Sequence, residues 1–524
     1  MLRKMFLFLF CLVIGSMLVV PAMAVKPTGL YPDDVINVQA AVDAGGTVVL
    51  EAKNAAEEPT VFNFGPATAT ENVRVTISRP MTVMGEPGSK IIGGNMPIVC
   101  NSPGVTIQNL TLEAYAYCGI ASLNAGPGDK IIIRNNSLSS TQGGVVSYGV
   151  IPVKGIFLGF GILSEGNQCP IDILGNTIEQ NGAACYSFSN HAPLNFFGNT
   201  IKAPGGIITE ANAKHIQIGS VSAPNTIKAW YEGVWVITGS DDPDATISIQ
   251  NNTINLVQPP ADQLGFDAIC LNGNRSTDYP CPGKSTGQCD NWPQMPQILV
   301  EENIIHASQD LNSENILASE SIVIGRSANV CNNAIVRRNI IDGTAADGIG
   351  VYPYANNNLI EENDLRNLTT NYCSLFVVGR DNIFTKNKLG PSLWYPSVTV
   401  LWENIHIDNW AEVGLSMPTP DPAPVKNNVF IDNDYTATGK PGLFGLEFDW
   451  DALADFNILF VAVNGNHVLE NKWPEGTTMC DQIWEMACNN SIHGISHCKQ
   501  PNYDQAGLAA KIAQVIQNRL KRGR

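Results

Sequence analysis

Two segments of the chain alternate apolar residues with residues capable of acid–base chemistry. They are Asn404-Ile405-His406-Ile407-Asp408-Asn409-Trp410 and Gly445-Leu446-Glu447-Phe448-Asp449-Trp450. If the apolar residues of the first segment point inward in a β-strand, His406 and Asp408 point outward. By the same rule, Glu447 and Asp449 point outward from the second segment. A carboxylate pair beside a histidine suits general acid–base cleavage of a glycosidic bond, with retaining or inverting geometry set by the carboxyl separation. These four residues are the candidate catalytic centre, and a solvated strand face is the alternative.

Three earlier segments, 206–210, 233–237 and 348–352, have a similar alternation and add aromatic side chains. Aromatic faces stack on sugar rings, and carboxylates accept hydrogen bonds from sugar hydroxyl groups. The outward positions therefore predict a saccharide-binding row that consists of Glu210, Trp235, Tyr352 and Trp410. The acidic groups together with Asp451 are also a candidate site for Ca²⁺, which prefers oxygen ligands.

A short repeated phrase would bring these segments together. Between Ala334 and Gly390 it occurs three times, and the asparagines at its centre, Asn339, Asn363 and Asn387, are 24 and 24 residues apart. The other copies contain Asn136, Asn176, Asn199, Asn225, Asn252, Asn303, Asn433 and Asn471. A β-type phrase at this period predicts a solenoid whose turns bury their apolar sides against one another. Each asparagine is expected to occupy a left-handed corner and to hydrogen-bond to the next copy in a ladder.

The corners also predict which segments are neighbours. Asn387, Asn433 and Asn471 would place the two acid–base segments on successive turns. Because neighbouring strands lie about 4.8 Å apart, the histidine segment is expected within about 5 Å of the Glu447 segment.

The two ends of the solenoid are expected to carry helical caps. Residues 33–44 have apolar positions on one helical face, with Asp33 and Asp34 as capping candidates and Gly45-Gly46 as the stop. Thr47-Val48-Val49-Leu50 is expected to be the first strand, and residues 504–520 a second amphipathic helix.

The beginning of the chain has the pattern of a secretory signal. Arg3 and Lys4 precede an apolar run that ends in Ala22-Met23-Ala24, and no later segment is long and apolar enough to span a bilayer. The mature chain is therefore expected to be secreted or periplasmic, with no membrane span. Twelve cysteines remain after Cys11 leaves with the signal, so several disulfides are expected in that oxidising compartment. The net charge of −17 argues against nucleic acid as a partner.

The repeats, together with the opening from Val35 to Leu50, resemble the right-handed parallel β-helix repeats of the pectin-lyase-like superfamily. The resemblance covers about Asp33 to Trp473 and implies an all-β, right-handed parallel β-helix solenoid with short N-terminal and C-terminal capping helices. In that superfamily, ligands usually lie along the strand that follows the longer loop after the asparagine corner, which here selects the segments above. Lyases, hydrolases, epimerases, adhesins and envelope accessory proteins share the fold, so the fold alone does not assign an activity.

Known catalytic phrases of the superfamily are absent from the sequence. There is no Gly-His-Gly or Arg-Ile-Lys as in polygalacturonase-like hydrolases, and no Asp-Pro-His-Asp as in alginate epimerases. Arg326 and Arg380 end two ligand-side segments, and many pectate lyases use an arginine base, but no accompanying motif assigns them that role. Residues 241–244 are interpreted as a turn.

The sequence therefore predicts residues 1–24 as a signal peptide, 25–490 as the β-helix and 491–524 as a C-terminal helical cap. The expected partner is an extracellular polysaccharide, acted on by a lyase or glycoside hydrolase. The first alternative is a non-catalytic carbohydrate-binding or envelope adhesion protein. A copper accessory protein is the second, with a candidate ligand set that consists of Cys488, His493, His497 and Cys498.

Overall fold

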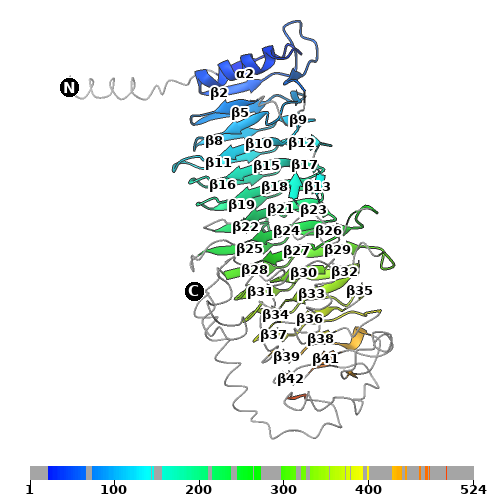
Figure 1. The fold of residues 1–524 in the computed structure, drawn as a ribbon. Helices are drawn as coiled ribbons and strands as arrows, with labels where there is room; N and C mark the ends of the chain where they lie inside the picture. Colours follow the sequence, from blue (N-terminus) through cyan, green and yellow to red (C-terminus); the bar gives the residue numbers. More distant parts are fainter. Residues whose placement is uncertain are drawn as a thin grey trace, which may run out of the picture. The chain divides into compact units, whose positions relative to one another are not determined.

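In the computed structural model, the chain consists of two compact units. Figure 1 labels their helices and strands. The N-terminal unit comprises residues 1–276 and 293–306, and the C-terminal unit comprises 277–292 and 307–524. The structure describes residues 22–66, 74–142, 144–146, 156–210, 215–237, 245–261, 263, 265–272, 297–313, 320–325, 331–352, 355–371, 373–377, 379, 381–393, 398–400, 428–438, 443–444, 459–461, 467–469, 471–472 and 491–492.

The strands of the N-terminal unit form three parallel sheets, called sheets I, II and III here. In spatial order, sheet I contains β1 Met23–Val25, β2 Thr47–Leu50, β5 Met81–Gly85, β8 Val105–Gln108, β11 Ile131–Arg134, β16 Ile171–Leu174, β19 Leu194–Phe197, β22 Ile216–Ile218, β25 Thr246–Gln250 and β28 Gln297–Glu301. Sheet II contains β4 Val75–Ile77, β7 Ile98–Cys100, β10 Cys118–Leu123, β15 Phe160–Glu165, β18 Ala183–Phe188, β21 Gly205–Glu210, β24 Glu232–Ile237 and β27 Ile269–Asn272. Sheet III contains β3 Phe62–Asn63, β6 Lys90–Ile92, β9 Thr111–Glu113, β12 Ser137–Ser140, β17 Thr177–Gln180, β20 Thr200–Lys202, β23 Thr226–Ala229, β26 Thr253–Val257 and β29 Ile304–Ser308, whose last two residues belong to the C-terminal unit. A separate antiparallel hairpin joins β13 Gly144–Val146 to β14 Ile156–Leu158.

The C-terminal unit also contains parallel strands, which are named here by the same three sheets. Those of sheet I are β31 Ala334–Arg337, β34 Leu359–Glu361, β37 Ile383–Thr385, β39 Val429–Ile431, β42 His467–Leu469 and β43 Ser491–Ile492. Those of sheet II are β30 Glu320–Ile324, β33 Asp347–Val351, β36 Leu375–Val377, β38 Val398–Val400, β41 Leu459–Val461 and β40 Leu443–Phe444, and those of sheet III are β32 Ile340–Ala345 and β35 Leu368–Thr370. A 3₁₀-helix, η3, spans Thr436–Thr438.

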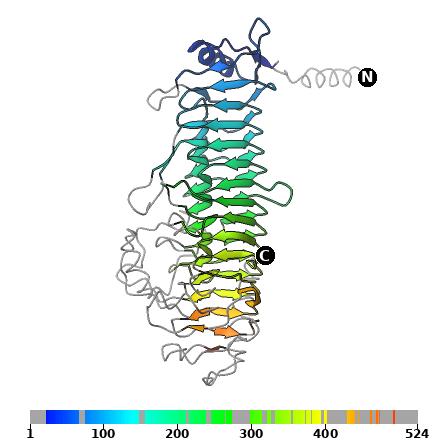
Figure 2. The ribbon, with the colours of Figure 1, turned by 90° about the vertical axis from the view of Figure 1, so that its right-hand side faces the viewer.

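Each turn of chain contributes strands to the sheets and stacks on its neighbours, as Figure 2 shows within each unit. Along the strands, alternate side chains point into the interior. In β5, for example, Met81 and Val83 are buried and Thr82 is partly exposed. The interior is filled by Ile, Val, Leu and Phe, because their branched and aromatic side chains pack well on a pleated surface. The predicted parallel β-helix is confirmed.

Buried asparagines form a hydrogen-bonded ladder in each unit. In the N-terminal unit, the side chains of Asn136, Asn176, Asn199, Asn225, Asn252 and Asn303 are linked in that order. In the C-terminal unit, the order is Asn339, Asn363, Asn387, Asn433 and Asn471. All eleven are at most 8% exposed. The predicted ladder is confirmed at every asparagine that the repeat selected.

One detail of the predicted corner is wrong. The left-handed residue is the one before the ladder asparagine, as in Asn135 (φ 55°), Asn251 (φ 57°) and Glu362 (φ 57°). The ladder asparagine itself is kept out of that conformation because its backbone N–H and side-chain amide both donate to the next rung. Asn363, for instance, donates from N at 3.1 Å and from Nδ2 at 2.9 Å to Oδ1 of Asn387.

The helix α2 spans Asp33–Ala44, as predicted, and contacts β1, β2, β3 and β4 at the start of the N-terminal unit. Asp33 and Asp34 do not cap it. The buried carboxylate of Asp34 instead accepts hydrogen bonds from the backbone N–H groups of Thr28, Gly29 and Asn63, so it fixes the chain around the helix. The second predicted helix, 504–520, lies outside the described residues. Within the described part of the chain, no helix is long and apolar enough to cross a membrane.

The prediction of disulfides is not supported. Seven cysteines are described, and no two of them lie at disulfide distance. They occupy buried strand and turn positions as small apolar side chains, such as Cys118 on β10 and Cys185 on β18, which β15 separates. Burial raises the pKa of both thiols well above the usual value. The other cysteines of the expected mature chain, Cys281, Cys289, Cys480, Cys488 and Cys498, lie outside the described residues.

Candidate functional site

The candidate site is the outer face of sheet II in the N-terminal unit. Register places Ala121, Leu163, Tyr186, Ile208, Trp235 and Cys270 side by side on consecutive strands. Their neighbours along each strand, such as Val234 and Val236 around Trp235, are buried in the interior. Strand alternation directs this row of side chains away from the interior. Tyr186 and Trp235 are partly exposed, whereas Ala121, Leu163, Ile208 and Cys270 are at most 5% exposed.

An aromatic cluster with a carboxylate lies on this face. The ring of Phe160 is 5.4 Å from that of Tyr117 and 5.1 Å from that of Tyr186. The hydroxyl group of Tyr186 donates a 2.6 Å hydrogen bond to Oε2 of Glu210, one strand further along the sheet. Glu210 is partly exposed, as predicted for an outward position on β21.

Trp235 projects from β24, directly beside Ile208 of β21 and Cys270 of β27. Its side chain is half-buried, so part of the indole is accessible. The Nε1 atom, however, is buried and has no hydrogen-bond partner among the described residues. Outward orientation of Glu210 and Trp235 on adjacent strands therefore agrees with the sequence interpretation, although both are less exposed than expected.

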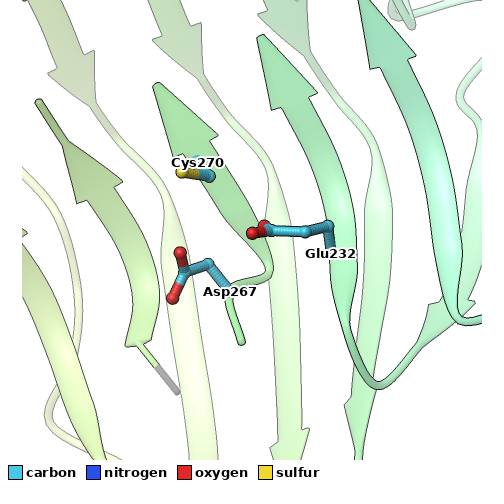
Figure 3. A group of neighbouring side chains, drawn as sticks. All are labelled: Glu232, Asp267 and Cys270. Atoms are coloured by element: carbon cyan, nitrogen blue, oxygen red, sulfur yellow. The ribbon is translucent and has the colours of Figure 1, made fainter. Parts of the chain in front are cut away.

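Next to Trp235, three buried donor groups converge (Figure 3). Glu232 begins β24, Asp267 lies just before β27, and Cys270 lies within β27. One carboxylate oxygen of each acid and the Sγ atom of the cysteine lie within 4.8 Å of one another. The exposed fraction is 3% for Glu232, 0% for Asp267 and 1% for Cys270. The sequence analysis missed this carboxylate–thiol cluster, which consists of Glu232, Asp267 and Cys270.

A local pattern could have identified the acids of the cluster. In each case an aromatic residue, an acid and a small residue enter sheet II: Tyr231-Glu232-Gly233 and Phe266-Asp267-Ala268. The aromatic rings pack 4.7 Å apart, which aligns the two acids on successive turns. In the C-terminal unit, Glu320-Ser321 and Asp347-Gly348 also begin two paired strands with an acid and a small residue, but no aromatic residue precedes them.

Tyr352, in the C-terminal unit, is not an exposed position, which corrects the sequence expectation. It is 3% exposed, its ring lies 5.6 Å from that of Phe376, and its hydroxyl group donates a hydrogen bond to Glu320. The ring folds back over Gly350, where an added Cβ would be 3.0 Å from Tyr352 Cε2. Tyr352 therefore forms a buried tyrosine–carboxylate pair rather than an accessible stacking platform.

The remaining predicted site residues lie outside the described part of the chain. They are His406, Asp408, Glu447, Asp449, Trp410, Asp451, Arg326, Arg380, the segment 241–244 and the candidate copper ligands Cys488, His493, His497 and Cys498. The proximity of the four predicted catalytic residues therefore stays a prediction.

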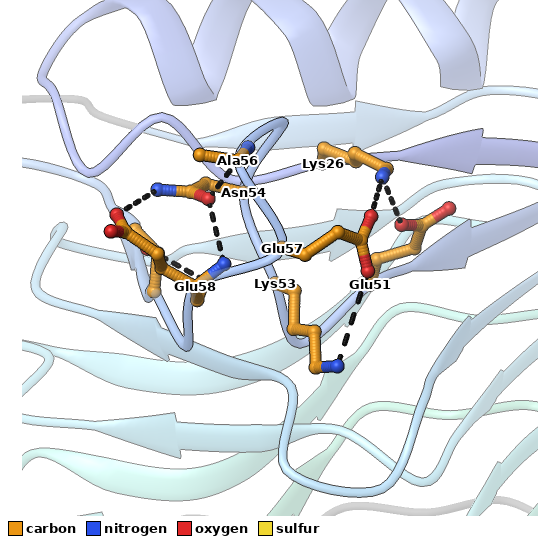
Figure 4. Close-up of polar contacts among 8 residues, drawn as sticks. Lys26, Glu51, Lys53, Asn54, Ala56, Glu57 and Glu58 are labelled. Atoms are coloured by element: carbon orange, nitrogen blue, oxygen red, sulfur yellow. Dashed lines mark hydrogen bonds and ion pairs between the residues drawn. The ribbon is translucent and has the colours of Figure 1, made fainter.

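A second polar cluster, near the start of the chain, is structural. Lys26 lies 2.6 Å from Glu57 and 3.6 Å from Glu51, while Lys53 lies 3.9 Å from Glu57 (Figure 4). The hydrogen bond from Lys26 lowers the pKa of Glu57. Lys26 directly follows β1, while Glu51, Lys53 and Glu57 lie on the loop after β2, and all four side chains are at least partly exposed. Oδ1 of Asn54 closes this loop by accepting from the N–H groups of Ala56 and Glu58. These ion pairs stabilise a surface turn, and their charged groups do not form a buried ligand-binding cluster.

Comparison with known proteins identifies neither a family nor a relative by sequence. No protein-family model matches the chain, and no curated protein matches it significantly. Among solved structures, it is similar to PfbA, a surface adhesin of Streptococcus pneumoniae, with 12% identity and a TM-score of 0.35 over 69% of this chain and 92% of that one. It is also similar to the A-module of the Azotobacter vinelandii mannuronan C-5 epimerase AlgE4, with 10% identity and a TM-score of 0.33 over 89% of this chain and 97% of that one. The A-module of AlgE6 from the same organism is also similar, with 13% identity and a TM-score of 0.28 over 90% of this chain and 94% of that one. By its three parallel sheets and its asparagine ladders, this chain is a parallel β-helix protein.

Proposed function

We propose that this protein binds an extracellular polysaccharide along the outer face of sheet II. The observation that carries the proposal is the juxtaposition of Tyr186, Glu210 and Trp235 on three consecutive strands of one face. Aromatic rings supply the apolar surface on which a sugar ring stacks. The carboxylate, oriented by the tyrosine hydroxyl group, supplies an acceptor for sugar hydroxyl groups.

The geometry of stacked strands favours a linear polymer as the ligand. Outward side chains recur at the strand spacing of about 4.8 Å along the sheet. This repeat is similar to the length of one sugar unit in an extended chain. Consecutive units of a polysaccharide can therefore meet consecutive strands, and affinity can accumulate over several weak contacts.

Charge favours a neutral polysaccharide over an acidic one. The chain carries a net charge of −17, and the face itself includes Glu165 and Glu210. Like charges would repel a polyanion unless a cation bridges them. The predicted signal peptide, 1–24, supports action outside the cytoplasm, in the secreted or periplasmic space where such polymers occur.

Binding can be tested with a panel of neutral and acidic polysaccharides, each with and without Ca²⁺, by affinity electrophoresis of the purified protein. A neutral polysaccharide should retard the wild-type protein, and Trp235→Ala should remove most of that retardation. Glu179→Gln, which alters an exposed carboxylate on the outer face of sheet III, is the matched control and should behave as wild type. Failure of every polysaccharide to bind, or equal binding by Trp235→Ala, would contradict the proposal.

The same panel tests the predicted enzymatic activity. A lyase would generate unsaturated products that absorb ultraviolet light, and a hydrolase would release reducing ends. If His406, Asp408, Glu447 and Asp449 form a catalytic centre, Glu447→Ala with Asp449→Ala should abolish turnover and leave binding at Trp235 intact. Binding without products assigns the non-catalytic role, that of a carbohydrate-binding or adhesion protein.

A further inference from the structure

We propose that the carboxylate–thiol cluster of Glu232, Asp267 and Cys270 binds a thiophilic divalent cation such as Zn²⁺. The cluster combines two carboxylates with a thiol, and its donor atoms lie within 4.8 Å of one another. Ligand atoms around a tetrahedral Zn²⁺, bound at 2.0 to 2.3 Å, lie about 3.3 to 3.8 Å apart. Side-chain rotations that bring the three donors about 1 Å closer together would therefore close them around an ion.

The backbone holds the three donors at these positions. The N–H groups of Gly233 and Val234 donate to the carbonyl oxygens of Asp267 and Ala268, both at 2.9 Å. A Cβ added at Gly233 would lie 2.4 Å from the carbonyl oxygen of Ala268, so the close approach of the two turns depends on glycine. The donors thus project from paired backbone that is ordered before any ion binds, which lowers the entropic cost of binding.

The donor types select the class of ion. Ca²⁺ takes six to eight oxygen ligands, and a sulfur donor does not suit it. Zn²⁺ and similar ions accept thiolate and carboxylate together, and three protein ligands leave a fourth position for water or a small ligand. A divalent ion would also supply positive charge next to two carboxylates that are at most 3% exposed.

Trp235 supplies an independent indication of a ligand at this place. It lies directly beside Cys270 in register, and its buried Nε1–H has no acceptor among the described residues. A buried donor of this kind is costly unless an acceptor is present. Water or a small anion brought in with the ion is the acceptor that we propose for this N–H group.

The test uses the full chain after removal of metal by a chelator and dialysis. Titration with Co²⁺ reports thiolate ligation directly, because a cobalt–thiolate bond gives a charge-transfer band in the near ultraviolet. One Co²⁺ per chain should bind with this band, and Zn²⁺ should displace it. Cys270→Ser should lose the band, and Asp267→Asn should weaken Co²⁺ binding about tenfold or more while the circular dichroism spectrum stays that of wild type.

A matched control is Cys185→Ser, which changes another buried thiol on sheet II, three strands away and directed into the interior. It should keep the band and the stoichiometry. Absence of a thiolate band in the wild-type protein would overturn the proposal. So would a band that persists in both Cys270→Ser and Asp267→Asn, because the ion would then be held by other residues. If Cys270→Ser fails to fold, Asp267→Asn and Glu232→Gln decide the question by affinity alone.

Discussion

The hydroxyl group of Tyr186 donates a 2.6 Å hydrogen bond to Oε2 of Glu210, across two paired strands of sheet II. This bond holds the carboxylate in one orientation next to the aromatic cluster. Tyr186→Phe keeps the ring and removes only the donor, so it should weaken polysaccharide binding by about 1 kcal/mol, or roughly fivefold. Isothermal titration measures the difference. Tyr31→Phe, at an exposed tyrosine beside α2, should leave the affinity unchanged, and a loss there equal to that of Tyr186→Phe would refute the role of the bond.

The asparagine ladder should contribute to the stability of the repeats. Asn199 is 1% exposed, donates through Nδ2 to Ile173 and Asn225, and accepts from the N–H and Nδ2 of Asn176. Asn199→Ala leaves several of these buried groups without partners, each at a cost of about 1–3 kcal/mol. Its thermal unfolding midpoint should fall clearly below that of wild type. Asn37→Ala, at an exposed position of α2, should change the midpoint little. Equal midpoints for both variants would show that the ladder is not stabilising.

The ladder could be predicted from the sequence because every rung repeats one residue type at one position of a periodic phrase. The position of the left-handed residue at each corner could not be predicted in the same way. In pairs such as Asn135-Asn136, either residue tolerates a positive φ, and only the hydrogen bonds of the stacked turns decide which one adopts it.

The candidate site depends on relationships that a strand pattern does not contain. The outward direction of Trp235 follows from alternation within one strand and was predicted. The proximity of Glu232 and Asp267, which are 35 residues apart in the sequence, depends on how β24 and β27 align. The irregular sequence between them hides this alignment. The burial of Tyr352 depends on the missing side chain of Gly350, which lets the ring fold back onto the strand.

The buried thiols of Cys100 and Cys331 should be reduced and unreactive in the native protein. Burial raises the pKa of Cys100 and of Cys331 to about 12, so neither forms thiolate near neutral pH. Iodoacetamide should fail to label them at pH 8 and should label them fully after denaturation without a reductant. Mass spectrometry of the peptides gives the result for each cysteine. Labelling that requires prior reduction would reveal disulfides and contradict the structure.

Acid should remove the contribution of one surface ion pair to stability. Hydrogen bonds from Arg366 lower the pKa of Asp364 below its ordinary 3.8, with Nη2 and Oδ2 at 2.6 Å. Because the folded state favours the ionised carboxylate, this stabilisation is present above pH 3.8 and is lost as the pH falls through the lower folded pKa. Asp364→Asn should therefore lower the unfolding midpoint slightly at pH 7 and not at pH 2. A difference that is independent of pH would contradict this origin. Arg366→Gln should reproduce the pH dependence of Asp364→Asn.

The central claim is that the outer face of sheet II binds sugar through Trp235. The most direct measurement is the affinity of the best polysaccharide from the panel for wild type, Trp235→Phe and Trp235→Ala, by isothermal titration. A roughly fivefold or greater loss is expected for the alanine variant, since stacking of a sugar ring on an aromatic face is worth about 1 kcal/mol or more. Phenylalanine should partly restore the affinity. Equal affinity of all three proteins, with folding unchanged by circular dichroism, would contradict it.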